Sequence, residues 1–283
     1  MSKISYVNGA YFNHKDASVN IEDRGYQFAD GVYEVFAVLN KRIVDFDAHL
    51  NRLYRSLNEI SLKSPIVKEA YLFHIKNLIR KNNVKDGLIY LQISRGVAQR
   101  DFKFPKNTKP SLVITAKSIS IENYHTNFDT GIKIKTTEDL RWKRVDIKTL
   151  NLLPPVLAKQ KAIENDCEEA WMIDAEGYVT EGSSSNAWIL IKDELITTPA
   201  TTSILNGITR TSLIKALKKK NIKLKERRFN KKDIQNADEA FITSATQFVM
   251  PVVKVDKTKI GNGKVGKYAY MFKDAYMEAI QLK

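Results

Sequence analysis

The sequence predicts an α+β fold built from two domains with largely antiparallel sheets. Strand-like segments follow one another in pairs joined by short turns, and they outnumber the amphipathic helices that stand between them. A polar stretch without periodicity then interrupts the chain. We therefore expect a smaller N-terminal α+β domain over 1–117, a linker over 118–127 and a larger C-terminal domain over 128–283.

The chain should open with a β-hairpin. Asn8-Gly9 is a residue pair that type I′ turns prefer, and a tyrosine stands on either side of it. A second pair of strands is predicted over 33–38 and 43–46, with its turn at Asn40-Lys41. Both pairs are local in sequence, so an antiparallel arrangement follows for this part of the chain.

Two amphipathic helices should come next. Asp47 is placed to cap the first, and four aliphatic residues recur after it at spacings of three and four. Ser64-Pro65 combines a capping residue with a proline suited to a first helical turn, so the second helix should begin there and run to about Asn82. The aliphatic face of the first helix consists of Leu50, Leu53, Leu57 and Ile60, and strands are expected afterwards over 88–94 and 111–116.

The C-terminal part alternates strands and helices in the same way. Ile132 and Ile134 alternate with lysines, which indicates a half-exposed strand. Pro154-Pro155 precedes a short helix. The predicted elements are helices over 156–164, 209–219 and 264–282, hairpins of 170–173 with 178–180 and of 186–191 with 195–198, and a strand over 240–243.

The composition is that of an ordinary globular protein, with 283 residues, 43% hydrophobic and 28% charged. No long apolar run and no apolar N-terminal leader occur, and Cys167 is the only cysteine, so we expect a cytoplasmic protein. The net charge is +14, but 32 acidic residues are interleaved with the 46 basic ones. We therefore expect the charge to attract anionic small molecules, and we expect no nucleic-acid or membrane partner.

The histidines argue against a metal centre. They are dispersed and form neither an HxxxH nor an HExxH pattern. A GxSxG serine elbow and a GxxxxGK[ST] phosphate loop do not occur either. We therefore expect no bound metal; the four histidines are His14, His49, His74 and His125.

Two segments combine ionisable residues in a way that suggests a site. Residues 22–34 place four carboxylates, an arginine and two tyrosines around two glycines, where the ordinary alternative is a turn-rich loop that leads into a strand. Lys148 stands among apolar residues, with Lys143 and Arg144 just upstream. A lysine in such surroundings is the kind used for Schiff-base chemistry, although most lysines of a basic protein lie on its surface.

Three further segments could bind an anion. Residues 180–186 join two predicted strands through a glycine and three consecutive serines. Residues 206–210 form a glycine turn that opens a helix, with Thr209 as the expected N-cap, and a helix N-terminus presents free N–H groups to an anion. Residues 243–246 form another hydroxyl cluster after a strand. Each pattern is common, since linkers and ordinary N-caps share it.

Taken together, these segments resemble the fold-type IV pyridoxal-phosphate aminotransferases, and among them the D-amino acid aminotransferases. The similarity extends from about Tyr6 to Gly266, which is nearly the whole chain. The segments that carry it are Glu22 to Phe28, Asp30 to Val35, Asp146-Ile147-Lys148, Leu150 to Leu153, Ala158-Lys159-Gln160, Thr180 to Asn186 and Gly207 to Arg210. The resemblance implies a two-domain fold in which the C-terminal domain binds pyridoxal 5′-phosphate, and it implies a homodimer.

The resemblance also implies a role for each site residue. Lys148 corresponds to the catalytic lysine that holds the cofactor as a Schiff base, and Glu181 to the carboxylate that pairs with the protonated ring nitrogen. Arg52 corresponds to the arginine that clamps the phosphate, a task that suits its planar fork of donors. The remaining cofactor contacts implied are Leu205 against the ring and Ile208, Thr209, Ser244 and Ala245 at the phosphate.

The substrate carboxylate would be held by Tyr33 and Arg100, with Arg100 coming from the partner subunit. The related D-amino acid enzymes have Arg-x-His at this position, whereas here Arg100-Asp101-Phe102 places an apolar ring where a donor is expected. The activity implied is transamination between a D-amino acid such as D-alanine and a 2-oxo acid by a ping-pong mechanism. Phe102 leaves the preferred substrate open.

Four alternatives remain at this point. Within the family they are a branched-chain L-amino acid aminotransferase, an (R)-amine transaminase and the related aminodeoxychorismate lyase. Outside it, the net charge of +14 leaves a basic nucleic-acid-binding module as a remote possibility.

Overall fold

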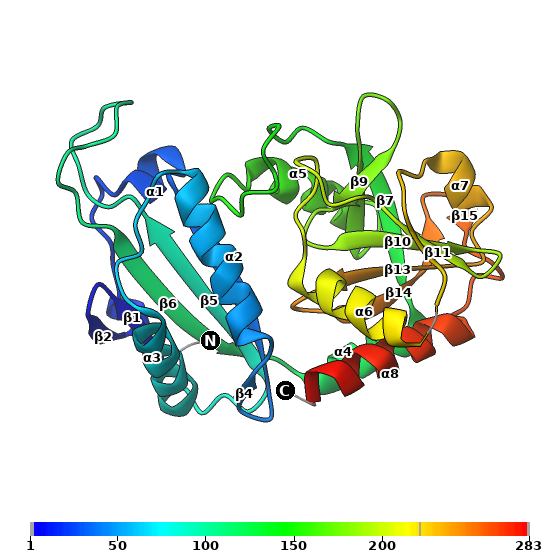
Figure 1. Ribbon diagram of the computed structural model, residues 1–283, viewed down its shortest axis with the longest axis horizontal. Coiled ribbons are helices and arrows are strands. Elements are labelled where there is room, and N and C mark those ends of the chain that lie inside the picture. The colour runs from blue at the N-terminus through cyan, green and yellow to red at the C-terminus, as the bar shows by residue number, and fades with distance from the viewer. Residues whose placement is uncertain (1–2, 221, 282–283) are drawn as a thin grey trace. The chain divides into compact units, whose positions relative to one another are not determined.

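The computed structural model describes residues 3–220 and 222–281. It divides into two compact units, shown in Figure 1. Unit 1 comprises Met1–Ser120 and Ile147–Asn151, and unit 2 comprises Ile121–Asp146 and Leu152–Lys283. Each unit contains its own sheet, and the α+β class with mainly antiparallel pairing is confirmed.

Unit 1 is organised around a six-stranded sheet with the strand order β2-β1-β6-β5-β3-β4. Every pairing in it is antiparallel. The longest ladder joins β3 to β5, from Gly31 opposite Ser94 to Val38 opposite Gly87. The strands are β1 (Ile4–Val7), β2 (Ala10–Asn13), β3 (Gly31–Leu39), β4 (Arg42–Ile43), β5 (Gly87–Ser94) and β6 (Ser111–Ser118), and a 3₁₀ turn follows β2 at His14–Asp16.

The first predicted hairpin is confirmed, because Tyr6 pairs with Tyr11 across a turn in which Asn8 (φ 48°) and Gly9 (φ 102°) are both left-handed. The turn at Asn40-Lys41 is also confirmed, again with both residues at positive φ. The strand predicted over 43–46 was wrong beyond its first residue. β4 ends at Ile43, and a helix has already begun three residues later.

The helices of unit 1 begin at different residues from those predicted. α1 (Arg24–Phe28) was not expected; α2 spans Phe46–Glu59 and α3 spans Lys68–Lys81. Asp47 is not the N-cap of α2, because Asp45 takes that position in the left-handed conformation. Ser64 does not cap α3 either, since its hydroxyl donates to the carbonyl of Ile66 at 2.7 Å. Leu50, Leu53 and Leu57 are buried as predicted, with α2 packed on β3 and α3 on β1 and β6.

Unit 2 is organised around a nine-stranded sheet with the order β12-β11-β10-β13-β14-β7-β8-β9, and β15 pairs with β14. Three of its pairings are parallel, namely β11 with β12, β14 with β7 and β7 with β8. The strands are β7 (Ile132–Glu138), β8 (Glu169–Ile173), β9 (Val179–Gly182), β10 (Asn186–Ile191), β11 (Glu194–Thr197), β12 (Leu224–Glu226), β13 (Glu239–Ser244), β14 (Phe248–Val255) and β15 (Thr258–Lys259).

The two hairpins predicted in unit 2 are confirmed, since β8 pairs with β9 and β10 with β11. Residues 121–127 were expected to belong to an aperiodic linker, but they form most of the helix α4 (Ile121–Thr130), which packs on β14. Thr209 is not an N-cap, because α6 begins one residue earlier with Gly207 as its cap. The other helices are α5 (Leu153–Ile163), α6 (Ile208–Lys219), α7 (Lys231–Gln235) and α8 (Lys267–Gln281).

The five residues Ile147–Asn151 belong to unit 1, although the chain on both sides of them belongs to unit 2. They run beside the start of β3. Thr149 forms an antiparallel bridge with Val32, and the amide of Leu150 donates to the carbonyl of Gly31 at 3.1 Å. A Cβ added to Gly31 would lie 2.4 Å from the carbonyl oxygen of Ile93 and 2.9 Å from the side chain of Leu150, so glycine is required for this close approach.

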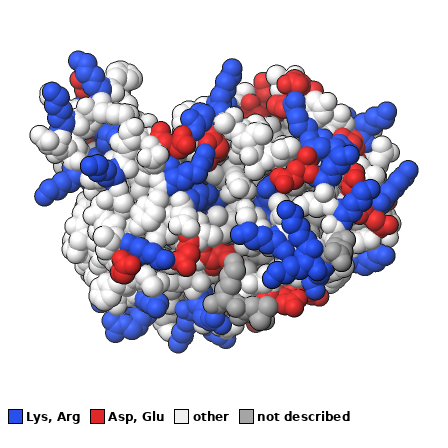
Figure 2. All heavy atoms as spheres, viewed as in Figure 1, with Lys and Arg blue, Asp and Glu red and all other residues white. Residues whose placement is uncertain are grey.

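The surface carries both signs of charge. On the face shown in Figure 2, lysines and arginines are spread among aspartates and glutamates. Among residues 3–220 and 222–281, no helix has the length and apolar character needed to cross a membrane. In the same residues, no group of His, Cys, Asp and Glu side chains is arranged to hold a metal ion.

Candidate active site

Lys148 is fixed by backbone contacts within unit 1. Its carbonyl accepts a hydrogen bond from the amide of Tyr33 at 3.0 Å, and its own amide donates to the buried Ser56 hydroxyl on α2 at 3.3 Å. The side-chain amine lies over the ring of Tyr33, with Nζ 4.1 Å from the ring centroid. The structure therefore brings together two of the predicted site residues, one from β3 and one from a distant segment of the chain.

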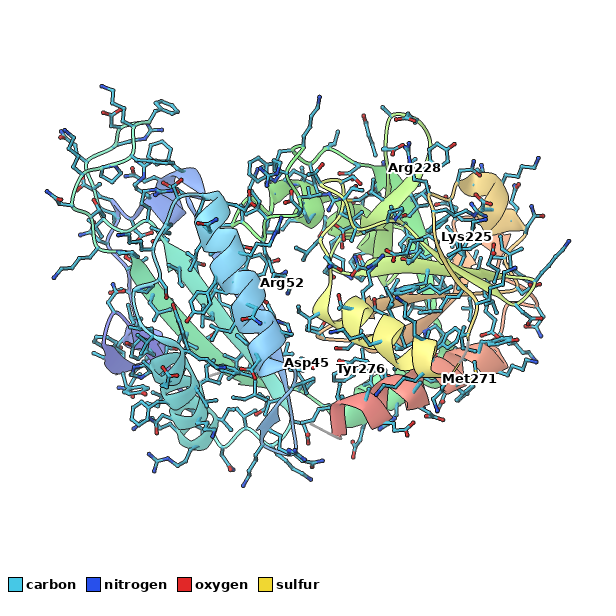
Figure 3. The ribbon with its side chains drawn as sticks, in the orientation of Figure 1. Asp45, Arg52, Lys225, Arg228, Met271 and Tyr276 are labelled. Atoms are coloured by element: carbon cyan, nitrogen blue, oxygen red, sulfur yellow. The ribbon has the colours of Figure 1, made fainter. Side chains whose placement is uncertain are left out.

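Arg52 lies on α2 (Figure 3), and it pairs with the buried carboxylate of Glu34 on β3. Its Nε donates to Oε1 of Glu34 at 2.7 Å and its Nη2 to Oε2 at 2.8 Å. His49 Nδ1 lies 2.8 Å from the same Oε2. This pairing orients the guanidinium that sequence reasoning assigned to a phosphate, and it explains why a carboxylate stands in the Asp30 to Val35 segment.

The electrostatics of this cluster follow from burial and pairing. Burial raises the pKa of Glu34, but the charge and hydrogen bonds of Arg52 outweigh this and hold the pKa at about 2. Burial lowers the pKa of His49, and the neighbouring Glu34 compensates only in part. Glu34 is therefore ionised and His49 neutral at neutral pH, so the pair Glu34 and Arg52 has no net charge.

Arg100 and Phe102 lie on the loop between β5 and β6, where a small aromatic cluster forms. The guanidinium carbon of Arg100 is 5.0 Å from the ring centroid of Phe28, and that of Arg24 is 4.6 Å from it. Phe102 meets the same ring edge to face at 5.6 Å, although 83% of Phe102 is exposed. Phe28 thus contacts Arg100, which is predicted to hold the substrate carboxylate, and Phe102, which stands where the related enzymes have a histidine.

Asp23 and Asp30 of the 22–34 segment bind the backbone and the arginines around them. Asp30 accepts from Nε of Arg24 and from Nε of Arg95, both at 2.8 Å. Asp23 caps α1 by accepting from the amide of Gly25 at 2.8 Å. Much of the charge concentrated in this segment therefore belongs to ion pairs within unit 1, and one of these pairs joins Glu34 to Arg52.

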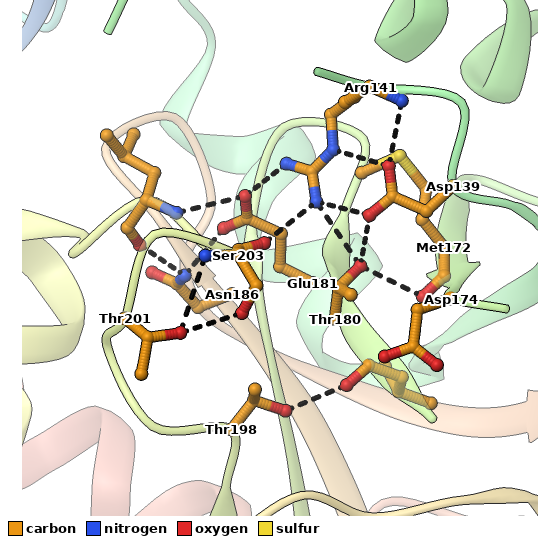
Figure 4. A network of polar contacts seen from close by, with 12 residues as sticks. Asp139, Arg141, Met172, Asp174, Thr180, Glu181, Asn186, Thr198, Thr201 and Ser203 are labelled. Atoms are coloured by element: carbon orange, nitrogen blue, oxygen red, sulfur yellow. Dashed lines mark hydrogen bonds and ion pairs between the residues drawn. The ribbon is translucent and has the colours of Figure 1, made fainter. Parts of the chain in front are cut away.

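In unit 2, Glu181 is buried on β9 with its carboxylate held at both oxygens. Oε1 accepts from the guanidinium of Arg141 and from the amide of Leu205 at 3.1 Å, while Oε2 accepts from Nδ2 of Asn186 at 2.9 Å (Figure 4). Asn186 also donates to the carbonyl of Leu205 at 2.9 Å. Leu205, predicted to touch the cofactor ring, is therefore tied to Glu181 by main-chain contacts.

Arg141 is the important residue that sequence reasoning missed. It stands in a run of Arg, Trp, Lys and Arg that is typical of a solvated surface, yet its side chain is only 9% exposed. Its Nε and Nη2 bind the two carboxylate oxygens of Asp139 at 2.8 and 2.7 Å. Thr180 donates to the same carboxylate at 2.7 Å. No local signal in the sequence pairs Asp139 and Arg141 with Glu181, because only the fold brings the segment that follows β7 to β9, two strands away in the sheet order.

The three serines of residues 183–185 do not project their hydroxyls toward open space. All three hydroxyls donate to the fully buried carboxylate of Glu169 on β8, at 2.9 Å for Ser184 and 3.2 Å for Ser185. The hydroxyls are held by this internal carboxylate, which anchors the loop that follows Glu181. That the loop binds an anionic ligand stays a prediction.

The N-terminus of α6 fits the anion-binding role predicted for Ile208 and Thr209. These are its first two residues, and the cap Gly207 has no side chain to accept from the free N–H groups. A Cβ at Gly207 would lie 2.1 Å from Oδ1 of Asn186, so the helix begins in contact with a residue that binds Glu181. Ser244 and Ala245 lie at the end of β13, where the Ser244 hydroxyl is 3.1 Å from that of Thr246.

Comparisons with known proteins agree with this fold. Residues 31–255 match the family model described as amino-transferase class IV. The chain is 39% identical to a D-alanine aminotransferase from Bacillus licheniformis over 92% of this chain and 90% of that one. It is 36% identical to a D-alanine aminotransferase from Staphylococcus haemolyticus over 99% of both chains.

Solved structures resemble the whole chain. A branched-chain amino acid aminotransferase from Escherichia coli superposes with a TM-score of 0.92 at 22% identity, covering 99% of this chain and 95% of that one. The T.th. enzyme of the same name, solved with pyridoxamine 5′-phosphate, gives 0.93 at 22% identity, covering 100% and 96%. At this identity the likeness concerns the fold.

Fold and family match together define a pyridoxal-phosphate-dependent aminotransferase. The chain belongs to the class IV aminotransferase family.

The residues present fit that cofactor. In unit 2, the carboxylates of Asp139 and Glu181 share the single guanidinium of Arg141, and the side chains are 10%, 7% and 9% exposed. Burial raises the pKa of Glu181, and Arg141 and the Leu205 amide only partly offset this, so the carboxylate would be stabilised by a further cation. A protonated pyridine nitrogen is such a cation.

Proposed function

We propose that this enzyme transfers the amino group of a D-amino acid such as D-alanine to a 2-oxo acid. The observation that carries the proposal is the difference in similarity. The chain is 36% to 39% identical, over at least nine tenths of its length, to enzymes named D-alanine aminotransferase, but 22% identical to the branched-chain enzyme whose fold it shares. The same difference weighs against the branched-chain alternative.

In this proposal Lys148 is the catalytic residue. Its amine would hold the aldehyde carbon of the cofactor covalently and, once displaced by the substrate amine, would act as the general base. The contact with Tyr33 and the two backbone hydrogen bonds of Lys148 support the role, because a base must be held in position to be effective. A base of this kind is worth about 10² to 10⁴ in rate.

Glu181 would hold a proton on the ring nitrogen of the cofactor. Its rigid carboxylate, bound by Arg141, Asn186 and the Leu205 amide, supports this assignment. When bound, pyridoxal 5′-phosphate supplies a ring that accepts electrons from the substrate Cα and an aldehyde carbon that carries the amino group. Lys148 would then take the proton from the substrate Cα and hold it for return. The keto acid leaves before the second substrate binds, which makes the cycle ping-pong.

The phosphate would be bound by residues of two kinds. Ile208 and Thr209 would offer backbone N–H groups at the N-terminus of α6, where the helix dipole favours an anion. Arg52 would supply a guanidinium that Glu34 already orients. Ser244 and Ala245 would add hydroxyl and backbone contacts, and Leu205 would pack on the ring.

The substrate carboxylate would be held by Tyr33 and by Arg100 of a second copy of the chain. The surface around Arg100 supports an interface between copies, because it exposes several large apolar side chains on two neighbouring segments. A bridge between Asp23 and Val97 joins these segments. The exposed side chains are Ile21 (78%), Tyr26 (77%), Phe102 (83%) and Phe104 (60%).

Initial rates with paired enantiomers test the proposal. D- and L-alanine, D- and L-glutamate and D- and L-leucine should each be assayed with pyruvate or 2-oxoglutarate as acceptor. We expect D-alanine or another small D-amino acid to be the best donor, with pyruvate released in step with amine transfer. If each L-form were faster than its D-partner, the D-specific assignment would fail and the branched-chain assignment would replace it. Pyruvate elimination without amine transfer would favour the lyase alternative.

A further inference from the structure

Three buried charged side chains of unit 2, Asp139, Arg141 and Glu181, form one connected cluster. Asp139 binds Arg141 through both carboxylate oxygens, at 2.8 and 2.7 Å, and the same guanidinium donates to Glu181 (Figure 4). Asp139 is also fixed by the Thr180 hydroxyl at 2.7 Å. Asp139 is therefore linked to Glu181 through Arg141, and through the Thr180 hydroxyl to the residue that precedes Glu181 in the chain.

With Glu181 ionised, as its proposed role requires, the cluster has an excess of one negative charge. Burial raises the pKa of Asp139, but the hydrogen bonds and charge of Arg141 outweigh this and hold its pKa below the usual range, so Asp139 is ionised. Two carboxylates then share one guanidinium. Among the described residues, the other donors to Glu181 are the neutral Asn186 amide and the Leu205 backbone. If Asp139 were neutral, Arg141 and Glu181 would form a balanced pair, and little attraction for another cation would remain.

We propose that Asp139 is a positioning residue for the cofactor. It neutralises the positive charge of Arg141, so that the negative charge of Glu181 remains available to pair with the protonated ring nitrogen. The inference rests on the proposed role of Glu181. Asp139 would act on the ring nitrogen without touching it. Because Asp139 is negatively charged, its effect is to favour the protonated, positively charged nitrogen. Removal of the Asp139 charge should weaken the hold on the ring nitrogen, even though every direct contact of Glu181 remains.

The test compares the binding of pyridoxal 5′-phosphate with that of its 1-deaza analogue, in which a CH group replaces the ring nitrogen. Both molecules carry the aldehyde and the phosphate, so the ratio of their dissociation constants isolates the ring-nitrogen contact. We expect the full-length wild-type chain, stripped of cofactor, to prefer the natural molecule by about tenfold to a hundredfold, the range of a charge-assisted hydrogen bond. In Asp139→Asn this ratio should fall by about fivefold or more.

Two further variants separate charge from structure. Asp174→Asn removes another aspartate that pairs with an arginine of unit 2, Arg228, and should leave the ratio unchanged. The double variant Asp139→Asn with Arg141→Gln restores the net charge of the cluster to that of Glu181 alone. It should recover most of the wild-type ratio, whereas a purely structural role for Asp139 predicts greater damage than in either single variant.

The outcomes distinguish the inference from the function on which it rests. If the wild type bound both molecules equally, the role of Glu181 would fail, and the inference with it. If the wild type discriminated and Asp139→Asn discriminated equally, only the inference would be overturned. If Asp139→Asn did not fold, Asp139→Ser would be measured in its place. The ratio should again fall, and a ratio equal to that of the wild type would overturn the inference.

Discussion

The amine of Lys148 lies over the ring of Tyr33, 4.1 Å from its centroid, and the amide of Tyr33 donates to the carbonyl of Lys148. Residues separated by more than a hundred positions are thus joined through both side chain and backbone. The contact orients a flexible lysine side chain without an ion pair, since the face of an aromatic ring attracts a cation.

Lys148 should be the residue that holds the cofactor. Borohydride reduction of the holoenzyme should make the link permanent, and digestion followed by mass spectrometry should find the label on the peptide that contains Lys148. Lys143 and Lys159 lie nearby in sequence and provide internal controls. Label on either of them, or on any other lysine, would contradict the assignment.

Glu181→Gln should keep the shape of the side chain while removing the charge that holds the ring proton. We expect cofactor still to bind and kcat to fall by orders of magnitude, because the ring then accepts electrons poorly. Glu176→Gln is the matched control, since Glu176 lies in the turn before the same strand and pairs with Arg228 at 2.9 Å. Wild-type turnover in Glu181→Gln would remove Glu181 from the mechanism.

Glu34→Gln should destabilise the fold in a pH-dependent way. It removes the buried charge with which Arg52 pairs, which costs about 3 to 5 kcal/mol. The pKa of Glu34 lies at about 2 in the folded chain and near 4.5 as its ordinary value. A depressed pKa contributes stability above the ordinary value and loses it as the pH falls.

The wild type should therefore exceed Glu34→Gln in unfolding free energy by the full amount at pH 6, and this difference should shrink as the pH falls from about 4.5 to about 2. Urea unfolding of both proteins across this range would measure it. Glu59→Gln, on the half-exposed side of α2, should change the unfolding free energy by less than about 0.5 kcal/mol. A difference between wild type and Glu34→Gln that did not vary with pH would mean that Glu34 is not ionised in the folded protein.

Arg100 should serve the site of the neighbouring subunit. Lys148→Ala and Arg100→Ala should each be inactive or strongly impaired alone. If the two are mixed and their subunits exchange, hybrid dimers with one intact site should restore part of the activity. Native mass spectrometry would verify the exchange. Exchange without restored activity would place Arg100 in the site of its own chain or in none.

Phe102→His should strengthen the hold on a substrate carboxylate. It restores a donor worth about 1 kcal/mol as a net hydrogen bond and up to about 3 if charged. We expect the KM for D-alanine to fall by between about fivefold and a hundredfold, with the preference for the D-form unchanged. Phe104→His introduces the same ring on the same loop at another exposed position and serves as the control. An unchanged KM would show that position 102 does not approach the carboxylate.

Elements defined by local chemistry were predictable from the sequence. The Asn8-Gly9 hairpin follows from turn residues that tolerate positive φ, and the buried face of α2 follows from its spacing. Helix starts were less predictable. Ser64-Pro65 has the composition of a helix start, but the Ser64 hydroxyl is instead engaged by Ile66 and Tyr71.

The site was predictable only in part. Lys148 and Glu181 stand in recognisable segments, whereas the partners that hold them come from distant strands, helices and loops. Arg141 reaches Glu181 across forty positions, and Glu169 reaches Ser183 across fourteen. Neither contact leaves a periodic or spacing signal, because pairings across a sheet depend on strand order rather than on sequence distance.

The insertion of residues 147–151 into unit 1 has a consequence for how this protein is made and inherited. A ribosome that has released only the first 120 residues has not yet supplied the strand-like segment that pairs with Val32 and Tyr33. Unit 1 can therefore be completed only after the start of unit 2 has emerged. For the same reason, recombination that exchanged the N-terminal unit as one continuous gene segment would leave Lys148 behind, so the two units should be inherited together.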